Sequence, residues 1–418
     1  MTHYRSALAV AAVVFFMWGF LTCLNDILIP HLKSVFELNY TRVMLVQFTF
    51  FGAYFLMSLP AGKLVDWLGY KKGMVAGLVI AGLGSLGFWP AAESHQYMAF
   101  LGALFVLATG ITVLQVAANP YVALLGPERT SSSRLTLAQA LNSLGTAIAP
   151  IFGGLLILGA TVKDNSQVDA MSMADQVAYR SAQAHAVQGP YVGIAVALFL
   201  LAVFVFVFRM PGFKPGGAAG HGEHSFADAL RHKHVLFGAL GIFCYVGSEV
   251  GIGSFLVNYL SLPQIGGISQ AQATHYVSAY WTLAMVGRFA GSWLLARYSP
   301  RHLLALFAGA NIVLLITTMA ASGHLAMYAI VATGLFNSIM FPTIFALGIR
   351  SLGPLSNKAS SLMIMAIVGG AIIPLLQGML ADRFGVHYAF ILPLLCYGYI
   401  IFYGLAGSRL PAGTAQGD

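Results

Sequence analysis

The chain has 418 residues, of which 58% are hydrophobic and only 8% charged, and its formal net charge is +8. Soluble proteins carry about a quarter charged residues, so this composition excludes a soluble enzyme and a disordered chain. The basic residues lie in short clusters between long apolar runs, which argues against a nucleic-acid-binding protein and indicates a polytopic membrane protein.

Twelve apolar segments follow one another along the chain, and each is long enough to cross a bilayer as an α-helix. They cover residues 7–31, 43–65, 73–92, 97–124, 134–158, 189–209, 234–262, 272–296, 301–321, 325–350, 357–381 and 387–408. Between them, residues 160–188 form a polar stretch and residues 210–233 a glycine-rich linker with a basic end. We predict an all-α membrane protein of twelve transmembrane helices in two six-helix bundles, residues 1–209 and 234–418, joined by a cytoplasmic linker.

Lys and Arg are distributed unevenly between the two sides that this topology creates. If the N-terminus is cytoplasmic, 16 of the 21 Lys and Arg residues fall on the cytoplasmic side, counting Arg288 with the inner end of its helix. Because cytoplasmic loops carry the excess of positive charge, we predict that both termini are cytoplasmic.

No pattern in the sequence indicates catalysis or metal binding. Cys23, Cys244 and Cys396 lie in apolar runs without metal-ligand spacing, so we expect them to be packing residues. A group of histidines falls mostly in the 210–233 linker, where a solvated loop is expected. We predict that the protein is not an enzyme and holds no metal or cofactor.

An internal repeat relates the two predicted bundles. Residues 145–156 of the fifth segment match residues 369–380 of the eleventh at an offset of 224. Pro120 of the fourth segment matches Pro342 of the tenth at an offset of 222. Matches at nearly one offset indicate duplication, and two parallel six-helix halves with a substrate site near the midplane between them form a transporter architecture.

The connection between the second and third segments contains a motif. Residues 62–72, GKLVDWLGYKK, resemble the GxLxDxxGxKK signature of the major facilitator superfamily. This resemblance implies a role in conformational gating, and the alternative is that these are topology-setting loop charges. The predicted gating residues are Gly62, Asp66, Gly69, Lys71 and Arg288.

Two carboxyl groups, Asp26 and Glu249, lie within apolar segments. Placing Asp there costs about 2.5–3.5 kcal/mol on insertion scales, so such residues usually face a cavity or an ion path. We predict that both couple transport to a cation. H⁺ is the first candidate and Na⁺ the second, while the structural alternative is a permanently protonated acid in a helix-packing hydrogen bond. Residues 245–254, which are rich in Gly and Ser, are expected to weaken the helix around Glu249 and free backbone carbonyls.

Polar and aromatic side chains at intramembrane depth are expected to mark the substrate path. Amides both donate and accept hydrogen bonds, which suits vicinal hydroxyls, and aromatic faces suit the C–H side of a sugar ring. We find no pair of Arg or Lys at the midplane for an anionic substrate, so a neutral sugar is the predicted ligand. Each amide could instead hold helices together. The candidates are Trp18, Asn25, Gln115, Asn119, Gln139, Asn142, Asn258, Tyr280, Trp281 and Asn337.

Eight short segments carry a closer family resemblance that covers nearly the whole chain. It is to the fucose permease/glucose–galactose transporter family of the major facilitator superfamily, and it implies a multi-pass sugar symporter of the bacterial inner membrane that works by alternating access. In fucose permeases, the acid at the position of Asp26 serves proton coupling. The segments are residues 25–30, 88–93, 117–121, 125–128, 137–143, 243–247, 287–289 and 341–345.

Five positions depart from the fucose permeases. Fucose permeases have Glu at the position of Gln115, Gln at that of Glu249 and Tyr at that of Phe341. They also lack the aromatic residues found here at Tyr280 and Trp281. This pattern resembles the glucose/galactose branch, so we predict import of glucose or galactose by cation-coupled symport, by a monomer in the bilayer. The alternatives are a symporter of N-acetylhexosamine or fucose, and a sugar uniporter.

Overall fold

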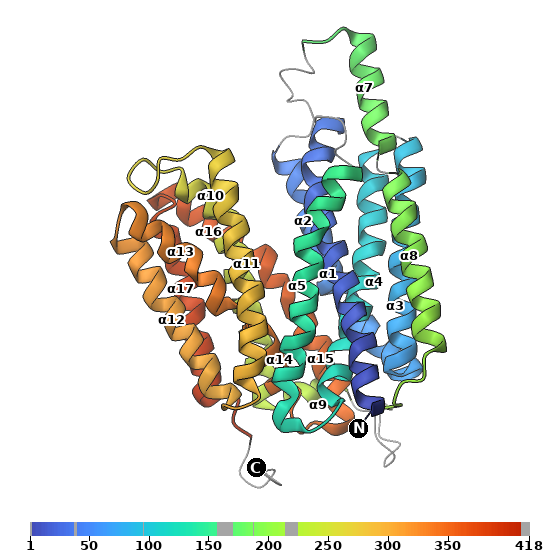
Figure 1. Cartoon of the computed structure of the whole chain (residues 1–418), viewed down its shortest axis with the longest axis vertical. Coiled ribbons are helices and arrows are strands. Elements are labelled where there is room, and N and C mark those ends of the chain that lie inside the picture. The colour runs from blue at the N-terminus through green and yellow to red at the C-terminus, as the bar shows by residue number, and fades with distance from the viewer. Residues whose placement is uncertain are drawn as a thin grey trace. The chain divides into compact units, whose positions relative to one another are not determined.

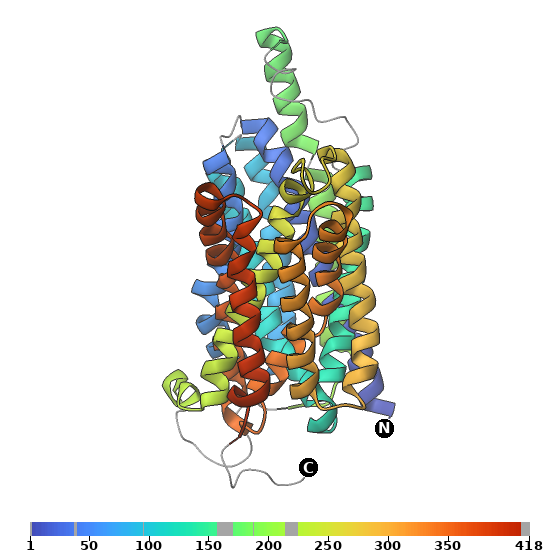
Figure 2. The same cartoon turned by 90° about the vertical axis from the view of Figure 1, so that its left-hand side faces the viewer.

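The computed structural model describes residues 2–36, 40–94, 96–156, 170–186, 188–213 and 225–410 (Figures 1 and 2). Within these residues the secondary structure is entirely helical, without a β-strand. The chain divides into two compact units, one formed by residues 1–118 and 144–212 and the other by residues 119–143 and 213–418. We call them unit 1 and unit 2.

Unit 1 is built from long helices that approach one another closely through small residues. Gly84 of α3 packs directly on Leu107 of α4, and Gly110 of α4 packs directly on Ala81 of α3, so a side chain at either glycine would clash. Small residues allow such close approach between membrane helices. The helices are α1 (Thr2–Phe36), α2 (Tyr40–Leu68), α3 (Tyr70–Ser94), the first part of α4 (Tyr97–Leu124), the last part of α5 (Ser131–Leu156), α7 (Met173–Ala186) and α8 (Gln188–Val207).

Unit 2 contains the last part of α4, the first part of α5 and all helices from α9 onward. Its longer helices are α10 (Lys233–Leu260), α11 (Gln270–Leu295), α12 (Pro300–Ala320), α13 (Gly323–Asn337), α14 (Met340–Gly348), α15 (Ser356–Met365), α16 (Gly369–Phe384) and α17 (Ile391–Phe402). Its short elements are α9 (Phe226–Leu230), the 3₁₀ turns Glu128–Thr130, Gly353–Leu355, Ala366–Val368 and Tyr388–Phe390, and a π-helical turn at Tyr403–Gly407.

Each of the twelve predicted segments is helical over most of its described length, and this confirms the helical fold class. Nine helices in the described part of the chain are long and apolar enough to cross a membrane. The first, fifth and eighth predicted segments are not among the nine, and α1 offers only the shorter apolar stretch Ser6–Thr22. Twelve spans and cytoplasmic termini therefore stay predictions.

The prediction of a weakened helix around Glu249 is wrong. Residues 245–254 lie within the continuous helix α10. Its glycines serve close packing instead, because Gly247 contacts Ile373 and the Gly369 carbonyl of α16, and Gly251 faces the Gln377 side chain.

Two other predicted segments do break. The eleventh divides into α15 and α16 around the 3₁₀ turn Ala366–Val368, and the tenth divides into α13 and α14. The break at residues 338–339 falls just before Pro342, the third residue of α14. Proline cannot donate a backbone hydrogen bond to the residue four positions earlier, and its ring clashes with the carbonyl group there. That residue is Ser338, so the position of the break follows from Pro342.

The boundary between the units runs through α4 and α5, so residues 119–143 pack with the later part of the chain. Glu128 Oε1 lies 3.0 Å from Arg350 Nε, and Ser133 Oγ donates to the Ser292 carbonyl at 2.7 Å. The division predicted at residues 209 and 234 stays a prediction, and residues 214–224 of the linker lie outside the described residues.

Candidate functional site

In unit 1, three predicted helices contribute to one buried polar cluster. Gln115 Nε2 of α4 donates to the Tyr54 hydroxyl of α2 at 2.7 Å. Trp18 of α1 also hydrogen-bonds to Tyr54. All three side chains are buried. Of these, Trp18 and Gln115 were predicted from the sequence, whereas Tyr54 was not.

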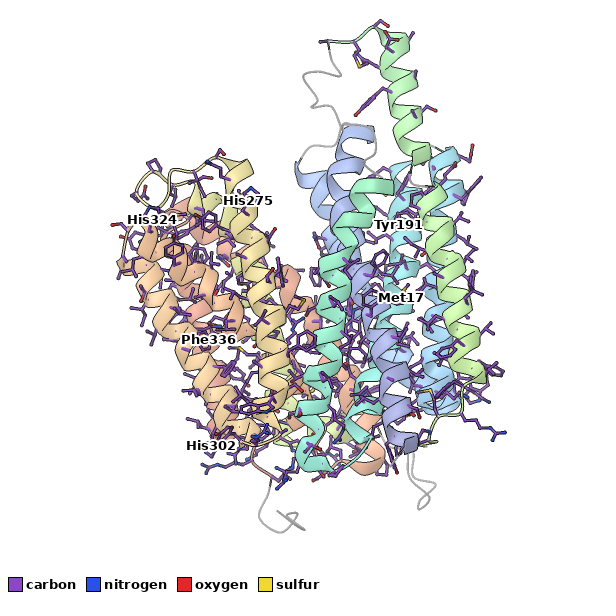
Figure 3. All side chains as sticks on the ribbon, viewed as in Figure 1. Met17, Tyr191, His275, His302, His324 and Phe336 are labelled. Atoms are coloured by element: carbon purple, nitrogen blue, oxygen red, sulfur yellow. The ribbon has the colours of Figure 1, made fainter. Side chains whose placement is uncertain are left out.

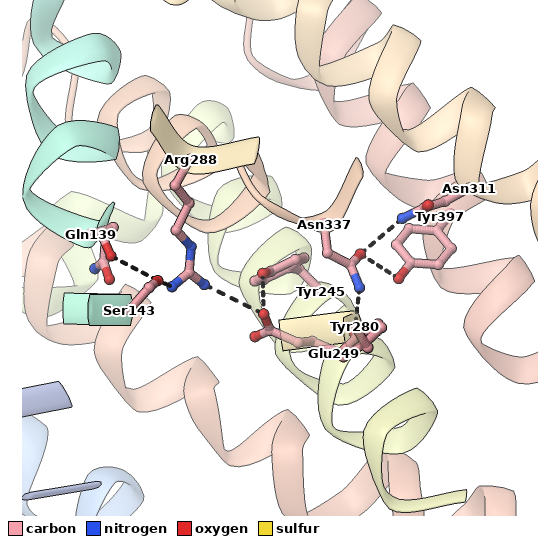
Figure 4. Close-up of polar contacts among 9 residues, drawn as sticks. All are labelled: Gln139, Ser143, Tyr245, Glu249, Tyr280, Arg288, Asn311, Asn337 and Tyr397. Carbon is pink, nitrogen blue, oxygen red and sulfur yellow. Dashed lines mark hydrogen bonds and ion pairs between the residues drawn. The ribbon is translucent and has the colours of Figure 1, made fainter. Parts of the chain in front are cut away.

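In unit 2, Asn337 is the centre of a second buried cluster (Figure 4). Its Nδ2 donates to the Tyr280 hydroxyl at 2.8 Å. Its Oδ1 accepts from the Tyr397 hydroxyl at 2.6 Å and from Asn311 Nδ2 at 2.8 Å. The four side chains are fully buried. Both acceptor sites of the Asn337 oxygen are thus occupied by protein donors, an arrangement that holds α11, α12, α13 and α17 together.

The two clusters repeat one motif. Gln115 and Asn337 are 222 positions apart, the offset that also relates Pro120 to Pro342. In the first half, an amide of α4 donates to the Tyr54 hydroxyl of α2. In the second half, an amide of α13 donates to the Tyr280 hydroxyl of α11. The repeat offset could have pointed to the amides. Tyr280 was a candidate from the sequence, but the pairing of each amide with its tyrosine becomes visible only in the packed structure.

Glu249 and Arg288 form a partly buried ion pair between α10 and α11 (Figure 4). Arg288 Nη2 lies 3.5 Å from Glu249 Oε1, and the two side chains are 12% and 14% exposed. The Tyr245 hydroxyl donates to the same carboxylate oxygen at 2.8 Å. Arg288 Nη1 donates to Ser143 Oγ of α5, which in turn donates to the Gln139 carbonyl at 3.1 Å.

This ion pair changes what the sequence indicates about both residues. Glu249, predicted to couple transport to a cation, has a fixed cationic partner, and its coupling role stays a prediction. Arg288, counted with the inner end of its helix, lies two turns before the end of α11 with its side chain largely buried. The pairing depends on how α10 packs against α11, so spacing in the sequence could not reveal it.

The other predicted substrate residues occupy varied surroundings. Asn119 is fully buried, and neither polar atom of its side chain has a hydrogen-bond partner among the described residues. Gln139 is buried and Asn142 half-buried, both on α5. On the unit 2 helices, Asn258 is exposed and Trp281 is 39% exposed.

The side chains of Asn25 and Asp26 lie outside the described residues, although α1 runs through both positions. The same holds for Cys23. The other two cysteines, Cys244 and Cys396, are buried and pack around Ile373, in agreement with their predicted packing role.

The motif at residues 62–72 forms the end of α2, the turn and the start of α3. Gly69 has φ +81°, a left-handed conformation that favours glycine. Lys71 Nζ donates to the Phe206 carbonyl at 2.8 Å, at the C-terminal end of α8, where a cation is favourable. Gly62 is buried and Asp66 half-buried near the end of α2. Lys71 therefore joins α3 to α8 within unit 1, and the gating role of this motif stays a prediction.

Comparison with known proteins decides the family. Residues 7–367 match the family model of the Major Facilitator Superfamily. The chain belongs to the Major Facilitator Superfamily. It resembles the crystal structure of FucP, a transporter of this superfamily in the outward conformation, with a TM-score of 0.91, 34% identity and coverage of 98% of this chain and 100% of that chain.

Sequence relatives support the same family. The chain is 51% identical to the glucose/galactose transporter of Brucella abortus, covering 97% of this chain and 95% of that protein. It is 45% identical to a putative glucose/galactose transporter of Helicobacter pylori, covering 98% of each. It is 35% identical to the L-fucose-proton symporter of Escherichia coli, covering 96% of this chain and 92% of that protein. The family resemblance predicted from the sequence is confirmed.

Proposed function

We propose that this protein is a secondary active transporter that imports a neutral monosaccharide, glucose or galactose, by cation-coupled symport with alternating access. The observation that carries the proposal is the 51% identity, over 97% of the chain, to a glucose/galactose transporter. Fucose is the alternative substrate, because a fucose-proton symporter is 35% identical. The chain acts by moving its substrate, without catalysing a chemical reaction on it.

The coupling cation in this proposal is H⁺, with Na⁺ as the alternative. The support is the intramembrane acid Asp26 and the proton named for the E. coli relative. We further propose that the chain is a monomer with twelve spans in the bacterial inner membrane, that both termini are cytoplasmic, and that it needs no cofactor besides the coupling cation. The bacterial relatives and the distribution of Lys and Arg support this arrangement.

The predicted substrate residues divide by their surroundings. Three of them are buried and form hydrogen bonds with protein groups, namely Gln115, Asn337 and Tyr280. We propose that these three residues position the helices that carry the site. Asn258 and Trp281 retain exposed surface, which supports direct contact with the sugar. The same reasoning favours Asn142, which is half-buried.

Transport by the purified protein in liposomes tests the proposal. We expect labelled galactose to accumulate when an inward H⁺ gradient is imposed, or an inward Na⁺ gradient if Na⁺ is the coupling ion. Competition by glucose, galactose, fucose, mannose and N-acetylglucosamine, at two pH values and with or without Na⁺, identifies the substrate and the cation. Absence of uptake and exchange for all five sugars would contradict the proposal.

A further inference from the structure

The facing surfaces of α10 and α11 carry two adjacent contacts. At one level Glu249 of α10 meets Arg288 of α11. One helical turn further along α10, Gly253 faces Trp281 of α11, and a Cβ placed on Gly253 would lie 3.6 Å from the Trp281 ring. Trp281 precedes Arg288 by seven residues, which places them on the same face of α11 two turns apart. An ion pair and an indole ring therefore lie one above the other.

The ion pair leaves hydrogen-bonding capacity unused. Arg288 Nε is buried and has no hydrogen-bond partner among the described residues. Glu249 Oε1 interacts with both Tyr245 and Arg288, and these two contacts do not use Glu249 Oε2. Buried polar groups are normally satisfied, so the unpartnered Arg288 Nε beside this carboxylate indicates a ligand position.

We infer that Glu249 and Arg288 together bind two neighbouring hydroxyl groups of the transported sugar. One hydroxyl donates to Glu249 Oε2, and the other accepts from an N–H of Arg288. Hydrogen bonds to charged partners are the stronger kind and confer geometric specificity. The exposed Trp281 ring covers an apolar C–H face of the same sugar. This inference rests on the proposed transport of a monosaccharide.

The charge of the pair agrees with a neutral ligand. The negative charge of the carboxylate and the positive charge of the guanidinium cancel. The site therefore offers strong hydrogen-bond donors and acceptors without a net charge that would favour an anion or a cation. Tyr245 and Ser143 hold the two groups in place by their own hydrogen bonds to Glu249 and Arg288. Such supporting contacts fix side-chain geometry before a ligand arrives.

The internal repeat separates Glu249 from Asp26, the acid that we propose for cation coupling. Asp26 and Glu249 are 223 positions apart, so they occupy equivalent places in the two halves. Tyr54 and Tyr280 also occupy equivalent places, and they are 226 positions apart. At the same offset, the residue of the first half that corresponds to Arg288 is Gly62. The second half therefore has an arginine at a position where the first half has glycine, and the contact of this arginine with Glu249 fixes the carboxylate in place.

The test measures hydroxyl discrimination by the purified full-length protein. Equilibrium binding of galactose is compared with binding of its 2-, 3-, 4- and 6-deoxy analogues, for the unsubstituted protein and for Glu249→Gln and Arg288→Lys. We expect loss of one or two particular hydroxyls to weaken binding to the unsubstituted protein by about tenfold or more. In both variants, galactose should bind about tenfold more weakly, and this discrimination should largely disappear.

A matched control is Arg297→Lys, since Arg297 lies just beyond α11 with its guanidinium over the Trp293 ring, 3.9 Å from the centroid. This variant should discriminate as the unsubstituted protein does. If Glu249→Gln does not yield a folded protein, Glu249→Asp keeps the charge on a shorter side chain and should still weaken binding at the same hydroxyls.

Two results would overturn the inference. If Glu249→Gln and Arg288→Lys discriminate between galactose and its deoxy analogues as the unsubstituted protein does, the ion pair only stabilises the packing of α10 and α11. Loss of the cation dependence of uptake in Glu249→Gln, with discrimination retained, would make Glu249 a coupling residue. Failure of the proposed function is a separate outcome, because the unsubstituted protein would then bind none of the sugars.

Discussion

The hydrogen bonds of a single buried residue indicate whether its side chain stabilises helix packing or binds a ligand. Replacing Asn337 by Ala would leave Tyr280, Tyr397 and Asn311 without a shared partner in a fully buried position. We expect the free energy of unfolding to fall by about 1–3 kcal/mol, measured as a lower thermal midpoint of the purified protein. Asn258→Ala, at an exposed position, is the control and should leave the midpoint nearly unchanged. An unaltered midpoint with sugar binding abolished would instead make Asn337 a ligand of the sugar.

The same residues show what the sequence can and cannot predict. Asp26 and Glu249 stand out because they are the two acids within apolar runs. The partner of Glu249 cannot be identified in this way. Arg288 lies 39 positions away on another helix and contacts Glu249 only because α10 packs on α11. Charged side chains can be found from composition and hydropathy, whereas their pairing is a property of tertiary structure.

At the scale of elements, glycine positions decide how closely helices approach. Gly247 of α10 lies against Ile373 and the Gly369 carbonyl of α16, and an added Cβ would overlap both. We expect Gly247→Ala to destabilise the protein by about 1–3 kcal/mol because the helices would have to separate. Gly309→Ala of α12, where the nearest atom lies 4.0 Å from the added Cβ, should be neutral or slightly stabilising. Equal thermal midpoints for the two variants would contradict this account of α10.

Element boundaries were predictable where a local cause exists. The hydropathy of the chain locates its helices, and Pro342 explains the break between α13 and α14. The continuity of α10 was not predictable, because a segment rich in Gly and Ser suits both a broken helix and a tightly packed one. The packing partner α16, more than a hundred residues later, decides between them.

Across the whole molecule, the duplication relates groups that also contact one another. Glu128 and Arg350 are 222 positions apart, so an acid of one repeat pairs with the base at the equivalent position of the other. Their side chains are 50% and 34% exposed. An ion pair exposed to this extent should contribute only about 0–1 kcal/mol. A double-mutant cycle of Glu128→Gln and Arg350→Gln, followed by thermal unfolding, should give a coupling energy in that range. A coupling above about 2 kcal/mol would contradict this estimate and show that the pair belongs to a stronger network.

The central claim is that sugar entry is coupled to a cation, and Asp26 is the proposed coupling residue. In liposomes without an imposed ion gradient, an inward galactose gradient should drive H⁺ entry, or Na⁺ entry if Na⁺ is the coupling ion. Asp26→Asn should abolish this sugar-driven cation flux and uphill uptake while retaining galactose exchange, because cation and sugar binding are linked reciprocally. Galactose entry by the unsubstituted protein without any movement of H⁺ or Na⁺ would contradict the claim and make the protein a uniporter.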